Sequence, residues 1–131
     1  MERTAKGSRQ MLKNASIFGS FSVDDLKTAR EFYGKTLGVT VENVDEMPVL
    51  NIGGENGVMI YEKPDHAPAT FTVLNFRVDN LKSTMKELKA KGVRFEIYDM
   101  EGLKTDSEGV VTHGEMSIAW FKDPAGNILS V

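Results

Sequence analysis

The sequence predicts an α+β fold made of two βαβββ repeats, whose strands form a curved mixed sheet around a cleft. Three observations predict this fold. The chain contains an internal repeat, each copy places a capped helix after its first strand, and a turn motif precedes the last strand. With 131 residues, the chain has the usual length of a single domain and enough material for a hydrophobic core.

Two pairs of matching segments define the repeat. Residues 21–28 read FSVDDLKT and residues 76–83 read FRVDNLKS, so that most positions are identical and the others are mainly close substitutions. Residues 37–42 (LGVTVE) then resemble residues 91–96 (KGVRFE), and this second pair lies one position closer together than the first. The first repeat therefore has one more helix residue than the second. We expect the domain to span residues 14–131, with its repeats at 14–63 and 70–131.

The elements of each repeat follow in the same order. A first strand leads into Val-Asp-(Asp/Asn)-Leu, where an Asp or Asn caps a helix. Both helices end at a glycine, Gly38 or Gly92, which suits a left-handed C-terminal position. The remaining strands are expected at 39–44, 48–52, 57–63, 93–98, 116–122 and 128–131. Residues 123–127 (DPAGN) form the turn before the last strand, because Pro presets φ and Gly permits a positive φ.

The first strands alternate in a way that separates a helix side from a cleft side. Between residues 15 and 23, the odd-numbered positions are apolar or small and should pack on the helix. The even-numbered positions, which include Phe18, Ser20 and Ser22, should face the cleft. The alignment of the first pair of matching segments maps these three onto Val73, Asn75 and Arg77, and the second strand alternates in the same register.

The same segments resemble a known family. Residues 21–26 (FSVDDL), followed by Phe32-Tyr33 and Leu37-Gly38, are similar to the opening pattern of the glyoxalase/bleomycin-resistance (vicinal oxygen chelate) superfamily, which includes the extradiol dioxygenases. Residues 120–127 (WFKDPAGN) resemble its closing pattern. The resemblance covers nearly all of the chain from residue 14 and implies the glyoxalase-like fold. It does not fix an activity, because this fold supports many chemistries.

The resemblance also identifies where a metal would bind. In metal-dependent members, four positions carry His or Glu ligands, and these correspond here to Phe18, Tyr61, Val73 and Ser130. Phe and Val cannot bind a metal, Tyr is an uncommon ligand, and Ser is a poor neutral one, whereas divalent metals in such sites need imidazole or carboxylate donors. We therefore expect no metal and no other cofactor, and we leave open whether the protein is an enzyme.

The resemblance to the bleomycin-resistance branch implies a protein that binds or sequesters a small molecule without a metal. Strand alternation favours a cleft lined by aromatic side chains, Phe71 among them, and by a few polar groups. The candidate ligand-binding residues are Phe18, Ser20, Tyr61, Val73, Asn75, Arg77, Trp120 and Ser130. Arg77 is the expected anchor for an anionic group.

Two other functions remain open. One is a metal-dependent lyase or dioxygenase with an unusual ligand set such as Glu62, His66 and His113, although loop positions favour solvated histidines. The other is a protein-interaction module with a vestigial cleft. The polar segment 99–115 is expected to be a lid, a mobile connection or a long hairpin tip.

Composition limits partners and location. The net charge of −3 gives no basis for binding nucleic acid, and no apolar run approaches the ~20 residues that span a membrane. The chain has no cysteine, which favours the cytoplasm. Residues 1–13 are expected to be a flexible tail. The resemblance implies a homodimer.

Overall fold

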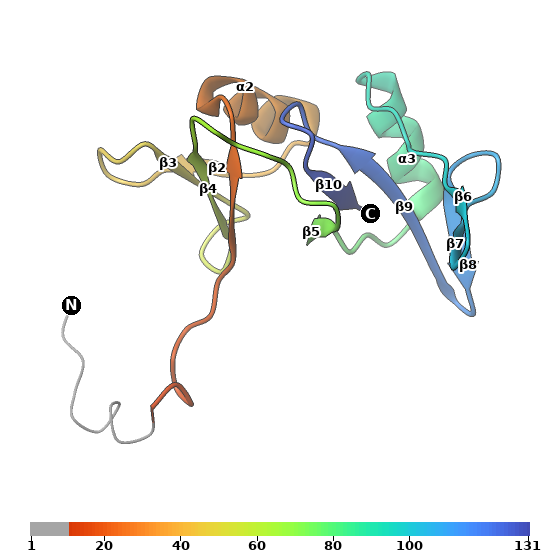
Figure 1. Ribbon diagram of the computed structural model, residues 1–131, viewed down its shortest axis with the longest axis horizontal. Helices are drawn as coiled ribbons and strands as arrows, with labels where there is room; N and C mark the ends of the chain where they lie inside the picture. The colour runs from red at the N-terminus through yellow and green to blue at the C-terminus, as the bar shows by residue number, and fades with distance from the viewer. Residues whose placement is uncertain (1–10) are drawn as a thin grey trace.

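The computed structural model describes residues 11–131, so residues 1–10 of the expected tail lie outside the described part. Two four-stranded sheets lie side by side (Figure 1). Sheet A contains β1 (Ser20–Val23), β2 (Val41–Asn43), β3 (Val49–Ile52) and β4 (Val58–Glu62). Sheet B contains β5 (Thr72–Asn75), β8 (Val110–His113), β9 (Met116–Lys122) and β10 (Ile128–Ser130). The helices are α2 (Leu26–Glu31), which continues into a π-helical turn η1 (Phe32–Thr36), and α3 (Leu81–Ala90).

The strand orders of the two sheets confirm the repeat. Sheet A has the order β1-β4-β3-β2 and sheet B the corresponding order β5-β10-β9-β8. In both sheets the first and last strands of the repeat are parallel, and the other pairs are antiparallel. The α+β fold class is confirmed, although the strands form two sheets instead of one continuous curved sheet.

The extra residue of the first repeat is accommodated in its helix. The Asp25 side chain caps α2 and the Asn80 side chain caps α3, as the pattern predicts. In the first repeat, η1 adds a wider turn in which the Leu37 N–H donates to the Phe32 carbonyl oxygen at 2.9 Å. A π-helical turn holds one residue more than an α-helical turn. This extra residue in the first helix explains why residues 37–42 and 91–96 lie one position closer together than residues 21–28 and 76–83.

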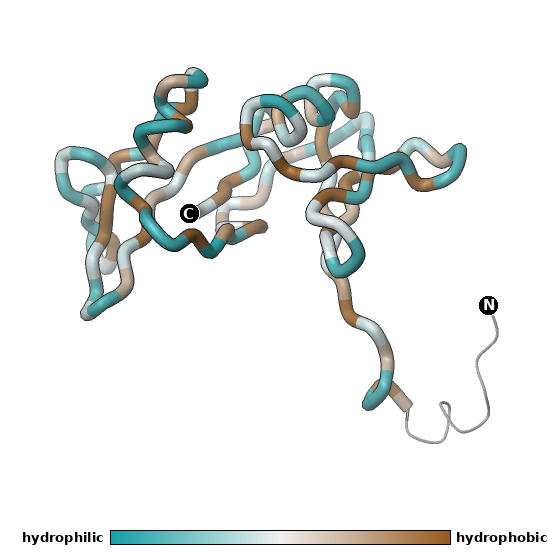
Figure 2. The backbone as a smooth tube through the Cα atoms, turned by 180° about the vertical axis from the view of Figure 1, so that it is seen from behind, coloured by the Kyte–Doolittle hydropathy of each residue, from teal (hydrophilic) through white to brown (hydrophobic). Residues whose placement is uncertain are grey.

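The first strand is shorter than the sequence indicates. The structure confirms the alternation at Phe21 and Val23, which are buried against the helix, but β1 begins only at Ser20. Residues 11–19 are exposed and run away from both sheets (Figures 1 and 2). The prediction that Ala15 and Ile17 pack on the helix is therefore wrong, because neither sheet extends far enough to pair with them.

The second repeat contains an additional hairpin. Where residues 93–98 were expected to form a strand, only the pair Phe95 and Phe121 forms a bridge to β9. The segment 99–115 forms β6 (Asp99–Met100), β7 (Leu103–Lys104) and β8, and β6 pairs with β7 in a hairpin, which was one of the expected alternatives. The hairpin is closed where the Thr105 N–H donates to the Tyr98 carbonyl oxygen at 2.9 Å.

One hydrophobic core joins the two repeats. Rings from both repeats form a continuous series: Tyr33 contacts Phe21 and Phe32, and Phe32 in turn lies 6.5 Å from Phe121 of sheet B between ring centroids. Tyr33 and Phe121 are fully buried. Each such side chain stabilises the fold by about 1.5–3 kcal/mol through burial alone. The packing therefore holds sheet A and sheet B in a fixed relation.

A buried carboxylate reinforces this contact. Asp123, at the turn before β10, accepts hydrogen bonds from the Tyr33 hydroxyl at 2.7 Å and from the Asn127 side-chain amide at 3.0 Å. Its other oxygen accepts from the backbone N–H groups of Ala125 and Asn127, both at 2.9 Å. Asn127 also donates to the Ser22 carbonyl oxygen of β1 at 2.9 Å. The turn of the second repeat is thus bonded to the helix and first strand of the first.

We expect Tyr33→Phe to lower the free energy of unfolding by about 2 kcal/mol, because it removes a buried hydrogen bond to a charged acceptor without changing the ring. Burial, and then the Asp123 charge, raise the pKa of Tyr33 far above its ordinary value. The folded protein keeps this phenol neutral where the unfolded chain ionises it, so its contribution is complete below about pH 10 and is lost as pH rises further.

Urea unfolding at pH 7 and at a series of alkaline pH values measures both effects. Tyr61→Phe is the matched control, because the Tyr61 side chain is exposed on sheet A. If Tyr33→Phe unfolded at the same urea concentration as the parent protein, the hydroxyl would contribute nothing to the contact between the repeats.

Candidate functional site

Each sheet has one face turned toward the helices and one face turned away from them. In sheet A, Phe21, Val23 and Ile60 lie in the core, so the alternate side chains point to the other side. We call this other side the open face of sheet A; it carries Ser20, Ser22, Asn51, Met59 and Tyr61. The open face of sheet B carries Asn75, Met116, Ile118, Trp120 and Ser130 by the same alternation.

Three of the predicted site residues belong to the first repeat. Ser20 and Tyr61 lie on the open face of sheet A, on the adjacent strands β1 and β4. Both are exposed, and Tyr61 retains 36% of its surface. Phe18 lies before β1, in the segment that leaves the sheet, and is 61% exposed. The structure therefore places Ser20 and Tyr61 together and leaves Phe18 apart from them.

The five predicted residues of the second repeat lie on or beside sheet B. The Ser130 hydroxyl donates to the Asn75 side-chain oxygen, which joins β10 to β5 on the open face. The Trp120 indole N–H donates to the Thr72 hydroxyl at 3.1 Å, which fixes the plane of its ring. Val73 is half-buried in β5, and Arg77 is exposed just beyond the strand.

Sequence reasoning missed Tyr98, which packs against Trp120. The two ring centroids are 5.7 Å apart and the rings are nearly perpendicular, at 79°. Such edge-to-face pairs leave aromatic surface available at their margin. The alternation of residues 116, 118 and 120 along β9 indicates Met116 and Ile118 as further members of this surface, but no local pattern indicates Tyr98, because the hairpin of the second repeat brings it there.

The predicted residues of the two repeats lie on different sheets. Among residues 11–131, no hydrogen bond or ring contact joins the open-face residues of sheet A to those of sheet B. Each open face belongs to one of the two sheets, and the two sheets lie side by side (Figure 1).

His66 makes a structural connection that the sequence does not indicate. Its Nε2 lies 3.0 Å from the Ala125 carbonyl oxygen, which can only accept, so Nε2 carries the proton. In the neutral ring, Nδ1 then accepts from the Ser22 hydroxyl at 2.7 Å. His66 is half-buried between β1 and the turn before β10 and not solvated in its loop, whereas His113 is exposed at the end of β8.

The residues of the alternative metal set are engaged separately. A Glu62 carboxylate oxygen accepts from the Leu26 N–H at the start of α2 at 2.9 Å, and His66 makes the two bonds just described. Within residues 11–131, no group of three His, Asp or Glu side chains lies close enough to hold one metal ion. The side chains of this chain therefore do not fit the metal that enzymatic members of such folds use.

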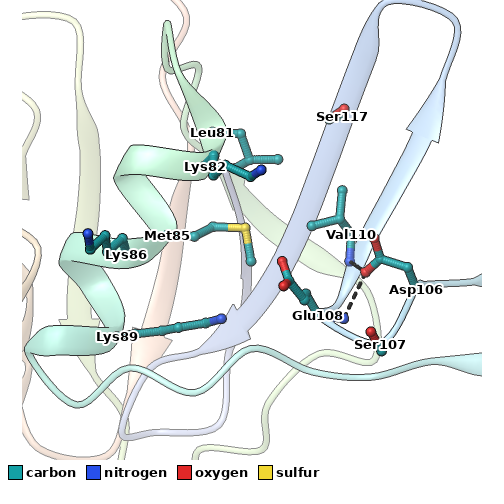
Figure 3. Close-up of a pocket in the computed structure, with 10 residues that line it drawn as sticks. All are labelled: Leu81, Lys82, Met85, Lys86, Lys89, Asp106, Ser107, Glu108, Val110 and Ser117. Atoms are coloured by element: carbon teal, nitrogen blue, oxygen red, sulfur yellow. Dashed lines mark hydrogen bonds between the residues drawn. The ribbon is translucent and has the colours of Figure 1, made fainter.

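A cavity lies beside α3, on the helix side of sheet B. Its volume is about 650 Å³, which falls in the range of small-molecule pockets, about 300–1,000 Å³. One wall is α3 and the other is the turn between β7 and β8 (Figure 3). None of the eight predicted site residues lines it. The lining residues are Leu81, Lys82, Met85, Lys86, Lys89, Asp106, Ser107, Glu108, Val110 and Ser117.

Asp106 shapes the turn that forms this wall. Its carboxylate accepts from the backbone N–H groups of Glu108 at 2.8 Å and Val110 at 2.9 Å. Hydrogen bonds from Val110, Glu108 and Gly109 lower the pKa of Asp106 below its ordinary value.

No helix among the described residues is long and apolar enough to cross a membrane.

The comparisons with known proteins agree with this geometry. The model of the Glyoxalase/Bleomycin resistance protein/Dioxygenase superfamily matches residues 18–131. No curated protein matches the sequence.

Solved structures share the fold at low sequence identity. A superfamily member from Sphaerobacter thermophilus is 20% identical with a TM-score of 0.66, over 88% of this chain and 94% of that one. TnmS3, an antibiotic-binding protein from Streptomyces sp. CB03234, is 21% identical with a TM-score of 0.64, over 89% of this chain and 94% of that one.

The Asp106 turn generates a prediction about acid stability. Because the pKa of Asp106 is lowered in the folded protein, its contribution is present above the ordinary Asp value of about 3.9 and is lost as pH falls below it. Asp106→Asn keeps an acceptor oxygen but cannot titrate. We expect the variant's stability to fall less steeply than the parent's between about pH 4 and pH 2.

Urea unfolding midpoints across that range test this expectation. Asp99→Asn serves as a control, because Asp99 is also exposed in the hairpin but its side chain makes no hydrogen bond among the described residues. Parallel acid profiles for the parent protein and Asp106→Asn would contradict it.

Proposed function

The chain belongs to the Glyoxalase/Bleomycin resistance protein/Dioxygenase superfamily, and from this premise we propose that it binds a small planar molecule without the help of a metal. The observation that carries this proposal is the Trp120–Tyr98 pair on the open face of sheet B. An oriented aromatic pair bordered by short polar groups is the form that sites for aromatic ligands take.

The surroundings of the pair support such a ligand. Ile118 and Met116 continue the apolar surface along β9, and Met116 is 64% exposed. Asn75 supplies a polar edge beside the rings, and Arg77 supplies a positive charge beyond it. A structural relative is described as an antibiotic-binding protein, which supports the binding of a small molecule. Among the described residues no cluster of side chains could hold a metal ion, which supports binding without a metal.

A second copy of the chain would complete this surface. Among residues 11–131, Ser20 and Tyr61 on the open face of sheet A and Met116 on that of sheet B are exposed. Ile17, Phe18 and Phe71 are apolar and between 61% and 90% exposed, which is unusual for side chains that stay in water. We infer that the protein is a homodimer in which sheet A of one copy faces sheet B of the other.

The single tryptophan of the chain provides the binding assay, because Trp120 lies in the proposed site. We expect 8-anilinonaphthalene-1-sulfonate, an anion with a planar naphthalene ring system, to quench its fluorescence saturably. Tyr98→Ala should weaken this binding about five- to tenfold through the loss of one aromatic contact. Met47→Ala, which removes an exposed side chain from the turn between β2 and β3, is the control and should leave binding unchanged.

Equal affinities for the parent protein and Tyr98→Ala would contradict the assignment of the site. Saturable turnover that depends on an added divalent metal would contradict the metal-independent function. Positive results in the first experiment lead to a thermal-shift screen of planar natural products.

Sedimentation equilibrium tests the dimer separately from the ligand. We expect twice the chain mass of 14.5 kDa, and dissociation toward the monomer in Phe18→Glu, because a buried unpaired carboxylate is costly. Lys13→Glu is the control for charge, since Lys13 lies in the same exposed segment. A parent protein that remains a monomer at high micromolar concentration would exclude the shared site.

A further inference from the structure

We propose that the cavity beside α3 is a second ligand site, which takes a small carboxylate with a short apolar chain. This site lies on the opposite side of sheet B from the open face. Val110 and Ser117 line the cavity, whereas their neighbours Val111 and Met116 point to the open face. The two proposals therefore concern different surfaces and can fail independently.

The cavity exists because the second repeat is longer than the first. The segment from the glycine that ends the helix to the glycine that precedes the last strand runs from Gly92 to Gly126 in the second repeat, but only from Gly38 to Gly57 in the first. Part of this insertion is the turn at residues 106–108, which stands opposite α3. The first repeat has no segment that could form such a wall.

The wall formed by α3 is cationic. Lys82, Lys86 and Lys89 are spaced by four and three residues and all three line the cavity. Lys82 and Lys89 point toward the opposite wall, whereas the end of Lys86 points away from it (Figure 3). The ion pairs of residues 11–131 are Lys35–Glu31 and Lys63–Asp65, so none of these three lysines is neutralised by a carboxylate.

The acidic groups on the facing wall do not cancel this charge. One oxygen of the Asp106 carboxylate already accepts two backbone N–H groups of its own turn. Glu108 is exposed and is the second carboxylate of the lining. Three lysines and two carboxylates thus line the cavity, in a chain whose net charge is −3. This surplus favours an anion over a cation of the same shape.

The floor of the cavity is apolar and would contact the apolar chain of the ligand. Met85 points its thioether into the cavity, between the two walls (Figure 3). Leu81 and Val110 are half-buried beside it. A flexible thioether adapts to chains of different shape, and each methylene buried there adds about 0.8 kcal/mol. A carboxylate alone would use the lysines only, whereas a short-chain carboxylate would use both surfaces.

The first repeat provides an internal control for the charge. Lys27 occupies in the first repeat the place that Lys82 occupies in the second, because FSVDDLKT aligns with FRVDNLKS. Near Lys27, the start of α2 is already bonded to a carboxylate, because Glu62 accepts from the Leu26 N–H. Charge reversal on α2 therefore changes the total charge of the protein without changing the cavity.

The experiment is a titration of ¹⁵N-labelled full-length protein with octanoate, followed by two-dimensional NMR, with octanol and octylammonium as uncharged and cationic probes of the same chain length. We expect saturable shifts at the backbone N–H groups of residues 81–89 and 106–110. Octanoate should bind at least about tenfold more tightly than octylammonium, since the lysines attract one and repel the other.

Two pairs of variants test where the probe binds. Lys82→Glu combined with Lys89→Glu should weaken octanoate binding at least about tenfold, whereas Lys27→Glu combined with Lys35→Glu should leave it within about twofold. Ser117→Trp should fill the cavity and abolish binding, whereas Met116→Trp adds the same ring to the other face of β9 and should not.

Several results would overturn the proposal. These are equal affinities for the three probes, the same loss of binding in both charge-reversal variants, and the absence of saturable shifts. Octanoate shifts centred on Tyr98 and Trp120 would also overturn it, because they would assign the probe to the open face. Such shifts would leave the proposed function standing, whereas a failure of dye binding at Trp120 would leave this second site untouched.

Discussion

The hydrogen bond between the Tyr33 hydroxyl and the Asp123 carboxylate is the contact on which the arrangement of the two repeats depends. Tyr33 comes from the helix of the first repeat and Asp123 from the last turn of the second, 90 residues later. The Asp123 carboxylate accepts four hydrogen bonds from groups of the protein, and these compensate for its removal from water. The two motifs that identify the family in the sequence are therefore the two sides of one buried contact.

The polar groups around Asp123 between the repeats are bonded to one another, so a ligand would have to bind on the outer surfaces. His66 and Glu62, the residues that first suggest catalysis, are both used to hold segments in place. The side chains on the open faces are aromatic, aliphatic or polar, and those that line the cavity beside α3 include lysines. These residues support the proposal that the protein recognises a small molecule by its shape and charge.

The sequence predicts the fold well where the signals are local, as in helix caps and strand alternation. The helix caps at Asp25 and Asn80 and the alternation in β1 and β9 are local, so no distant contact overrides them. The extent of β1 could not be predicted, because alternation continues past Ser20 while the neighbouring strand ends. Strand alternation places Trp120 and Asn75 on the open face of sheet B, but no local pattern indicates Tyr98, which reaches Trp120 through an inserted hairpin. The cavity beside α3 depends on a packing distance that no residue pattern encodes.

The π-helical turn η1 makes the two repeats non-equivalent in a way that their similar sequences conceal. Each residue of an α-helix rotates the chain by about 100°, so the extra residue sets the direction in which the chain leaves the first helix toward β2. The first alignment places Leu88 of α3 opposite Tyr33, and leucine has no hydroxyl group to donate. A chimera that carried the second helix in both repeats would therefore lose the hydrogen bond to Asp123, so the two helices are not interchangeable.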